Sequence, residues 1–156
     1  CRESVMLNFC MISLVLIFAF AQASFAAPVE HETLLIDDAR VRMIHGNAPA
    51  TAAYASITNK GDQADRLVSI ATDIARKSEI HVMKVEDGVM SMRPLTDGII
   101  IAPGETVTLK PGGVHFMLMK LTSRPGMGEN VELRLTFEQA GTVTIMAPVV
   151  KIRHSH

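Results

Sequence analysis

The chain has 156 residues, which is enough for one domain of ordinary size and little more. Its formal net charge of −1 argues against binding of nucleic acid or of an anionic membrane surface, since both need an excess of positive charge. Aromatic residues make up only 4% of the chain and tryptophan is absent, so a surface that stacks on bases or sugars is not expected either.

The first predicted element is a signal peptide over residues 1–26. An apolar run over residues 11–21 is too short to cross a membrane comfortably, and small-residue sites of the kind that signal peptidase cuts follow it. Cleavage after Ala26 or Ala23 is favoured. An uncleaved membrane anchor is the alternative, whereas a cleaved protein would have no stable insertion in the membrane.

Both cysteines of the chain, Cys1 and Cys10, fall within this leader. A lipid anchor on Cys10 is disfavoured because the residue before it, Phe9, is not small. The processed domain, residues 27–152, and the tail after it, residues 153–156, therefore contain no thiol. A metal site of this domain in an oxidising compartment would use ligands other than thiolate. Eight of the ten methionines remain after processing: Met43, Met83, Met90, Met92, Met117, Met119, Met127 and Met146.

Short apolar runs separated by Gly and Pro predict an all-β domain after the leader. Glu79 to Val85 alternates and closes at Glu86-Asp87-Gly88, which is typical of a hairpin whose second strand runs from Val89 to Pro94. A single helical turn over residues 73–77 is the one helix considered. Eight to ten strands, with turns every 8–12 residues, favour a Greek-key sandwich or barrel. The other predicted strands cover residues 34–36 and 41–44 (a pair, or one bent strand), 53–58, 67–71, 99–101, 106–109, 116–121, 131–137 and 142–150.

Two His-x-Met units are the strongest chemical signal. In a strand, residues i and i+2 lie on the same face, so His81 shares a face with Met83, and His115 shares one with Met117 and Met119. Met90 and Met92 share a face of the predicted hairpin partner. If these faces converge, imidazole and thioether groups from three strands form one pocket.

Thioether and neutral imidazole together suit copper(I) better than other common metals, because magnesium and calcium prefer oxygen, and structural zinc favours thiolates or several imidazoles. The absence of cysteine from the domain excludes the usual blue-copper centre, which needs a thiolate. Core packing is the alternative for any one of these methionines, since buried Met is common. Two His-x-Met units and one Met-x-Met unit occur between His81 and Met119, and this clustering favours the metal interpretation.

The spacing of these residues resembles a known signature. His81, ten residues, Met92, twenty-two residues, then His115-x-Met117 is similar to the motif of the periplasmic copper chaperones for the copper A centre of cytochrome c oxidase, the PCuAC family. The resemblance extends from about Leu34 to Ile152. Other segments that carry it are Ala53-Tyr54, Thr58-Asn59-Lys60-Gly61, Asp65-Arg66-Leu67, Glu79-Ile80-His81, Met92-Arg93-Pro94, Leu109-Lys110-Pro111-Gly112-Gly113 and His115-Phe116-Met117-Leu118.

The resemblance implies a single cupredoxin-like Greek-key β-sandwich domain in the periplasm. Carried over residue by residue, it makes His81, Met92, His115 and Met117 the copper(I) ligands. Met83 and Met119 are secondary candidates, with packing as the default. The implied acceptors are the oxidase subunit that carries copper A, a Sco-type copper protein, or both. Some relatives capture copper(II) on a tail, so His154 and His156 are further candidates, although chain termini are usually disordered.

Three functions remain open at this stage. A copper carrier is favoured, while a copper storage or detoxification protein would use the same site without a specific acceptor. A β-sandwich whose Met-rich face binds a peptide rather than a metal is the third. The sequence offers no catalytic triad, phosphate-binding loop or carboxylate pair, so an enzyme is not expected.

Overall fold

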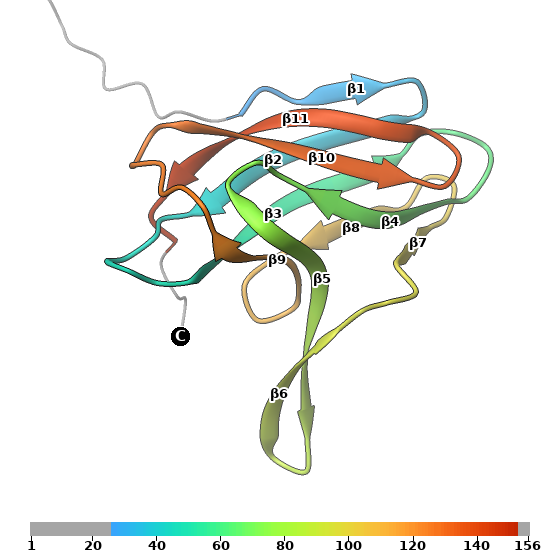
Figure 1. Ribbon diagram of the computed structural model, residues 1–156. Coiled ribbons are helices and arrows are strands. Elements are labelled where there is room, and N and C mark those ends of the chain that lie inside the picture. Colours follow the sequence, from blue (N-terminus) through green and yellow to red (C-terminus); the bar gives the residue numbers. More distant parts are fainter. Residues whose placement is uncertain (1–25, 153–156) are drawn as a thin grey trace, which may run out of the picture.

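The computed structural model describes residues 26–152 and consists of eleven strands joined by turns (Figure 1). Within these residues no helix is long and apolar enough to cross a membrane. The strands are β1 (Val29–His31), β2 (Leu34–Arg42), β3 (Ala50–Asn59), β4 (Asp65–Ala71), β5 (Ala75–Glu86), β6 (Val89–Pro94), β7 (Ile99–Ile101), β8 (Thr106–Leu109), β9 (Val114–Leu121), β10 (Asn130–Phe137) and β11 (Gly141–Val150).

The strands form two sheets that share one strand. In the first sheet the order is β6-β5-β9-β3-β2, with β1 added to β2 and β8 added to β3; in the second it is β11-β10-β4-β7. Strand β11 belongs to both. Its residues from Gly141 to Pro148 pair antiparallel with β10, whereas Val149 and Val150 pair parallel with Val41 and Arg42 of β2.

The core lies between the sheets and follows from period-2 alternation along the strands. In β9, Phe116 and Leu118 are fully buried, whereas the residues between and beside them face the other side of the sheet. In β10 the inward residues are Val131, Leu133, Leu135 and Phe137. Each such side chain contributes about 1.5–3 kcal/mol by leaving water, so this face of each sheet is firmly held. Because Phe116 and Leu118 point into the core, the alternate residues of β9 must point to the outer face of the sheet.

These features confirm the predicted all-β sandwich in a single domain, with corrections in detail. There are eleven strands rather than eight to ten, and β1 at Val29–His31 was not predicted. There is no helical turn over residues 73–77, because β5 begins at Ala75 and its first residues pair with the end of β9. The strand expected from Glu79 to Val85 is longer at both ends, because its beginning pairs with β9 and Glu86 at its end pairs with Val89 of β6. Of the two alternatives for residues 34–36 and 41–44, the single bent strand is confirmed: it is β2, which ends at Arg42 and whose register against β3 shifts between Asp37 and Arg40.

The β5–β6 hairpin extends beyond the body of the sandwich (Figure 1). Its turn residues, Asp87 and Gly88, both have positive φ, at 53° and 77°, as a two-residue type I′ turn requires. The predicted hairpin turn is therefore confirmed. Strand β6 is bonded to β5 alone and forms an edge of the first sheet.

Candidate metal centre

The two histidines of the predicted site lie directly opposite each other on adjacent strands of the first sheet, on the same face. His81 on β5 is the direct antiparallel partner of His115 on β9, so both side chains lie on the outer face, opposite the core residues Ile80 and Phe116. Their ring centroids are 6.1 Å apart, and both residues are buried.

The methionines occupy neighbouring positions on the same face. Met83 is the direct partner of Met92 in the β5–β6 ladder. Met117, two residues after His115, lies between Glu79 of β5 and Ala52 of β3. The small side chain of Ala52 leaves space beside this methionine.

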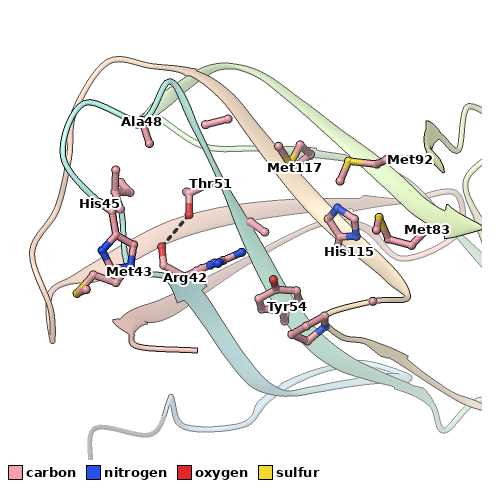
Figure 2. A pocket seen from close by; sticks show the side chains of 15 residues that line it. Arg42, Met43, His45, Ala48, Thr51, Tyr54, Met83, Met92, His115 and Met117 are labelled. Atoms are coloured by element: carbon pink, nitrogen blue, oxygen red, sulfur yellow. Dashed lines mark hydrogen bonds between the residues drawn. The ribbon is translucent and has the colours of Figure 1, made fainter. Parts of the chain in front are cut away.

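A cavity of about 340 Å³ lies on this face (Figure 2). Four of the predicted residues line it, namely Met83, Met92, His115 and Met117. In Figure 2 the sulfur atoms of the three methionines lie around the His115 ring on one side of the cavity. The segment that joins β2 to β3 supplies the other side with Met43, Ile44, His45 and Ala48.

His115 is held in one tautomer by the turn before β9. Its Nδ1 donates a hydrogen bond to the carbonyl oxygen of Gly113 at 3.1 Å, so Nε2 carries the free lone pair. Burial lowers the pKa of His115 below its ordinary value of 6.5, against the opposing effect of the Gly113 hydrogen bond. The ring is therefore neutral at physiological pH, the form in which imidazole binds a metal.

His81 is held by its neighbour on the same strand. Its Nε2 donates to a carboxylate oxygen of Glu79 at 2.9 Å, and Lys77 pairs with the other oxygen at 2.8 Å. These two contacts, that with His81 the larger, lower the pKa of Glu79, which stays ionised. The other ring nitrogen of His81, Nδ1, is buried and has no hydrogen-bond partner among residues 26–152.

A buried lone pair without a partner costs about 1–3 kcal/mol, and a ligand bound at this nitrogen would remove that cost. A metal at Nδ1 of His81 would complete a carboxylate–histidine–metal arrangement with Glu79. Over residues 26–152 there is no group of three or more His, Cys, Asp and Glu that could hold a metal. The donors available here are two neutral imidazoles and up to three thioethers, a set that fits copper(I) and does not fit calcium, magnesium or structural zinc.

The structure thus brings His81, Met83, Met92, His115 and Met117 onto one part of one face. Met119 lies on this face as well. It is two residues after Met117 on β9, between Lys77 and Ala50, and it does not line the cavity. His154 and His156 lie outside the described residues. Met90, two residues before Met92, is exposed near the tip of the hairpin.

Several residues of the site were not singled out from the sequence. Glu79 and Gly113 orient the two imidazoles, and each lies two residues before the histidine that it contacts. Met43 and His45 form a Met-x-His unit, the reverse of the two His-x-Met units, and this spacing was the available signal. Tyr54 also lines the cavity, and burial raises the pKa of its hydroxyl despite the nearby arginines, so the group stays neutral.

Sequence comparison relates most of the domain to one family. The profile of the LpqE-like lipoproteins matches residues 34–149. A lipoprotein of Leifsonia xyli subsp. xyli is 29% identical over 99 residues, which is 64% of this chain and 60% of that protein. The matched part of this chain thus spans about three fifths of that relative's length.

Solved structures with the same fold include copper-binding domains. The copper-bound PCuAC domain from PmoF2 superposes with a TM-score of 0.68 at 25% identity, covering 81% of this chain and 99% of that domain. The copper(I) form of DR1885 from Deinococcus radiodurans gives 0.56 at 32% identity, over 72% of this chain and 75% of that one. Apo-DR1885 gives 0.61 at 26% identity over 97% of both chains. The predicted cupredoxin-like sandwich of the PCuAC type is confirmed.

Proposed function

Since the chain belongs to the LpqE-like, PCuAC-type family, we propose that it binds one copper(I) ion through His81, Met92, His115 and Met117 and carries it to an acceptor protein. The observation that carries this proposal is the buried, unpartnered Nδ1 of His81 on the face where His115 and the thioethers gather. The copper-bound PmoF2 domain and the copper(I) form of DR1885 support the choice of metal.

All four proposed ligands bind in their neutral forms, which suits a carrier. Glu79 and Gly113 each hold one ring nitrogen of a histidine, Nε2 of His81 and Nδ1 of His115, and so leave the other nitrogen of each ring to bind the metal. Met92 is 45% exposed while the histidines are buried. An incoming donor would therefore displace the thioether of Met92 first, with the metal still held from within.

For the acceptor we propose the subunit of cytochrome c oxidase that carries copper A, reached directly or through a Sco-type copper protein. This part of the proposal follows from the family motif. The lipoprotein description of the family and of its Leifsonia relative supports an exported protein of the cell envelope, and the periplasm is the compartment we propose.

Titration of the metal-free protein with copper(I) tests the site. We expect one ion per chain, and a loss of affinity for Met92→Ala or His81→Ala that is at least as large as the about tenfold to hundredfold loss typical of an outer-shell partner of a ligand. Met146→Ala is the matched control, because Met146 is 48% exposed on β11 of the other sheet. A stoichiometry other than one, or equal affinities for Met92→Ala and Met146→Ala, would contradict the four-ligand site.

Copper storage is the second function and uses the same site. The two are separated by mixing the copper(I)-loaded protein with the metal-free copper A domain of an oxidase, separating the two proteins by chromatography at successive times, and measuring the copper bound to each. A carrier transfers the metal faster than it releases it to solvent. Transfer no faster than release to a small chelator would favour storage.

The tail gives a further proposal, that His154 and His156 bind copper(II). The backbone nitrogen of Met43 donates to the carbonyl oxygen of Val150 at 2.9 Å, so β11 ends beside the segment that lines the cavity. Removing residues 153–156 should abolish a copper(II) signal in electron paramagnetic resonance and leave copper(I) affinity unchanged. An unaltered copper(II) spectrum after truncation would refute the tail site.

A further inference from the structure

The β5–β6 hairpin has two chemically different faces. On the face that carries the proposed ligands, successive cross-strand pairs are Val85 with Met90, Met83 with Met92, and His81 with Pro94. We call Val85, Met90 and Met92 the hairpin's apolar face. They are 67%, 64% and 45% exposed. A row of large apolar side chains thus leads from the tip of the hairpin to the metal centre.

The opposite face of the hairpin is polar. Its pairs are Glu86 with Val89, Lys84 with Ser91, and Val82 with Arg93. Arg93 and Glu86 form an ion pair at 2.8 Å across it. Val89 is the one exposed large apolar residue on this side, also at 67%. The hairpin is therefore amphipathic, and within the described chain β6 is hydrogen-bonded to β5 alone.

Of the eight large hydrophobic residues exposed in the described chain, four lie on this hairpin: Val85, Val89, Met90 and Met92. Single exposed apolar residues are normal on a protein surface, whereas a contiguous group of them is a candidate interaction site. The area of this face, which comprises three side chains, is far smaller than the about 800 Å² and roughly 20–30 residues per partner of a stable interface. This area suits a brief encounter and is too small for a permanent dimer of this chain.

We propose that the apolar face of the hairpin is the docking surface for the copper-accepting protein. This inference rests on the proposed carrier function. Met92 belongs both to this face and to the proposed ligand set, so whatever covers the face also covers the accessible side of the metal. The partner is thus a protein whose own apolar surface surrounds a soft copper ligand, and it approaches over Val85 and Met90.

Two equally exposed valines on opposite faces of one hairpin provide the test. In Val85→Lys the charge lies on the apolar face, and in the control Val89→Lys it lies on the polar face. Both are loaded with one equivalent of copper(I) and mixed with the metal-free copper A domain of an oxidase. We expect Val85→Lys to slow transfer about tenfold or more, as for a central interface residue, and Val89→Lys to leave it nearly unchanged. Met90→Gln should slow transfer as well.

Release to a small copper(I) chelator is measured in parallel. It should be the same for all three variants, because Val85, Val89 and Met90 are not among the proposed ligands. Transfer should also vary little with salt, since the contact is apolar. Equal transfer rates for Val85→Lys and Val89→Lys would overturn the docking surface and leave the proposed function intact. No transfer from the unaltered copper-loaded protein would overturn both, whereas failure to bind copper at all would already appear in the titration.

Discussion

Glu79 acts on the metal centre through His81. Its carboxylate accepts a hydrogen bond from Nε2 of His81, which directs the lone pair of that ring to Nδ1. Glu79→Gln introduces an amide whose NH₂ group can donate to the same nitrogen and favour the wrong tautomer. We expect the copper(I) affinity to fall about tenfold to a hundredfold, measured by competition with a chelator. Glu138→Gln, which loses only an ion pair with Arg66 at 3.3 Å, should have no effect, and similar losses in both variants would contradict this role.

His115 makes the stability of the metal-free protein depend on pH. Because burial lowers its folded-state pKa below 6.5, the unfolded chain takes up a proton first as the pH falls. Its contribution to stability is complete above this value and is lost progressively as the pH drops through and below it. Urea unfolding between pH 7.5 and 5.5 should show this decline, and His115→Gln should show a smaller one. Parallel curves for the two proteins would argue against the effect.

Local spacing predicts which residues share a face, and it placed both His-x-Met units correctly on the strands. It could not distinguish Met83 from Met119, since each lies at an even spacing from a histidine. Cross-strand register decides between them: Met83 lies opposite Met92 and lines the cavity, while Met119 is one row further away. The roles of Glu79 and Gly113 were equally hidden, because they depend on hydrogen-bond geometry.

At the scale of elements, Asp65 ties the beginning of β4 to the turn between β10 and β11. Its buried carboxylate accepts hydrogen bonds from the backbone nitrogens of Arg66, Gln139 and Ala140, at 2.7, 2.8 and 3.1 Å. Asp65→Ala leaves these donors without their partner and should lower the free energy of unfolding by about 3 kcal/mol. Chemical denaturation measures the change. Asp62→Ala, in the preceding exposed turn, should cost less than about 0.5 kcal/mol, and comparable losses would refute the interpretation.

The elements themselves were largely predictable, because alternation and turn residues mark most strands. The exception is the beginning of β5, where Ala75-Arg76-Lys77 has no strand alternation and favours a helix by composition. Pairing with β9 overrides that preference, as Ala75 lies opposite Leu121 and Lys77 opposite Met119. The protrusion of the hairpin could not be read from the sequence either, since it depends on where the neighbouring strands end.

For the whole molecule, the proposed copper(I) site links metal supply to stability. A ligand that binds only the folded state adds about 2.7 kcal/mol to the free energy of unfolding when its free concentration is 100 times its dissociation constant. We expect the melting temperature to rise on addition of copper(I) and to return to its initial value with a strong chelator. The rise should be smaller in Met92→Ala. An equal rise in that variant would place the stabilising metal elsewhere.

Strand β11 has a consequence for how the molecule is made. It pairs with β10 in the second sheet and with β2 in the first, and it follows every other described strand in the chain. A chain that emerges with its N-terminus first therefore leaves β2 and β10 each without one of its partner strands until residues 141–150 are free, and the apolar surface beside these strands stays uncovered meanwhile. Such a protein should need a holding chaperone during synthesis or export, and truncation within β11 should leave a chain that aggregates.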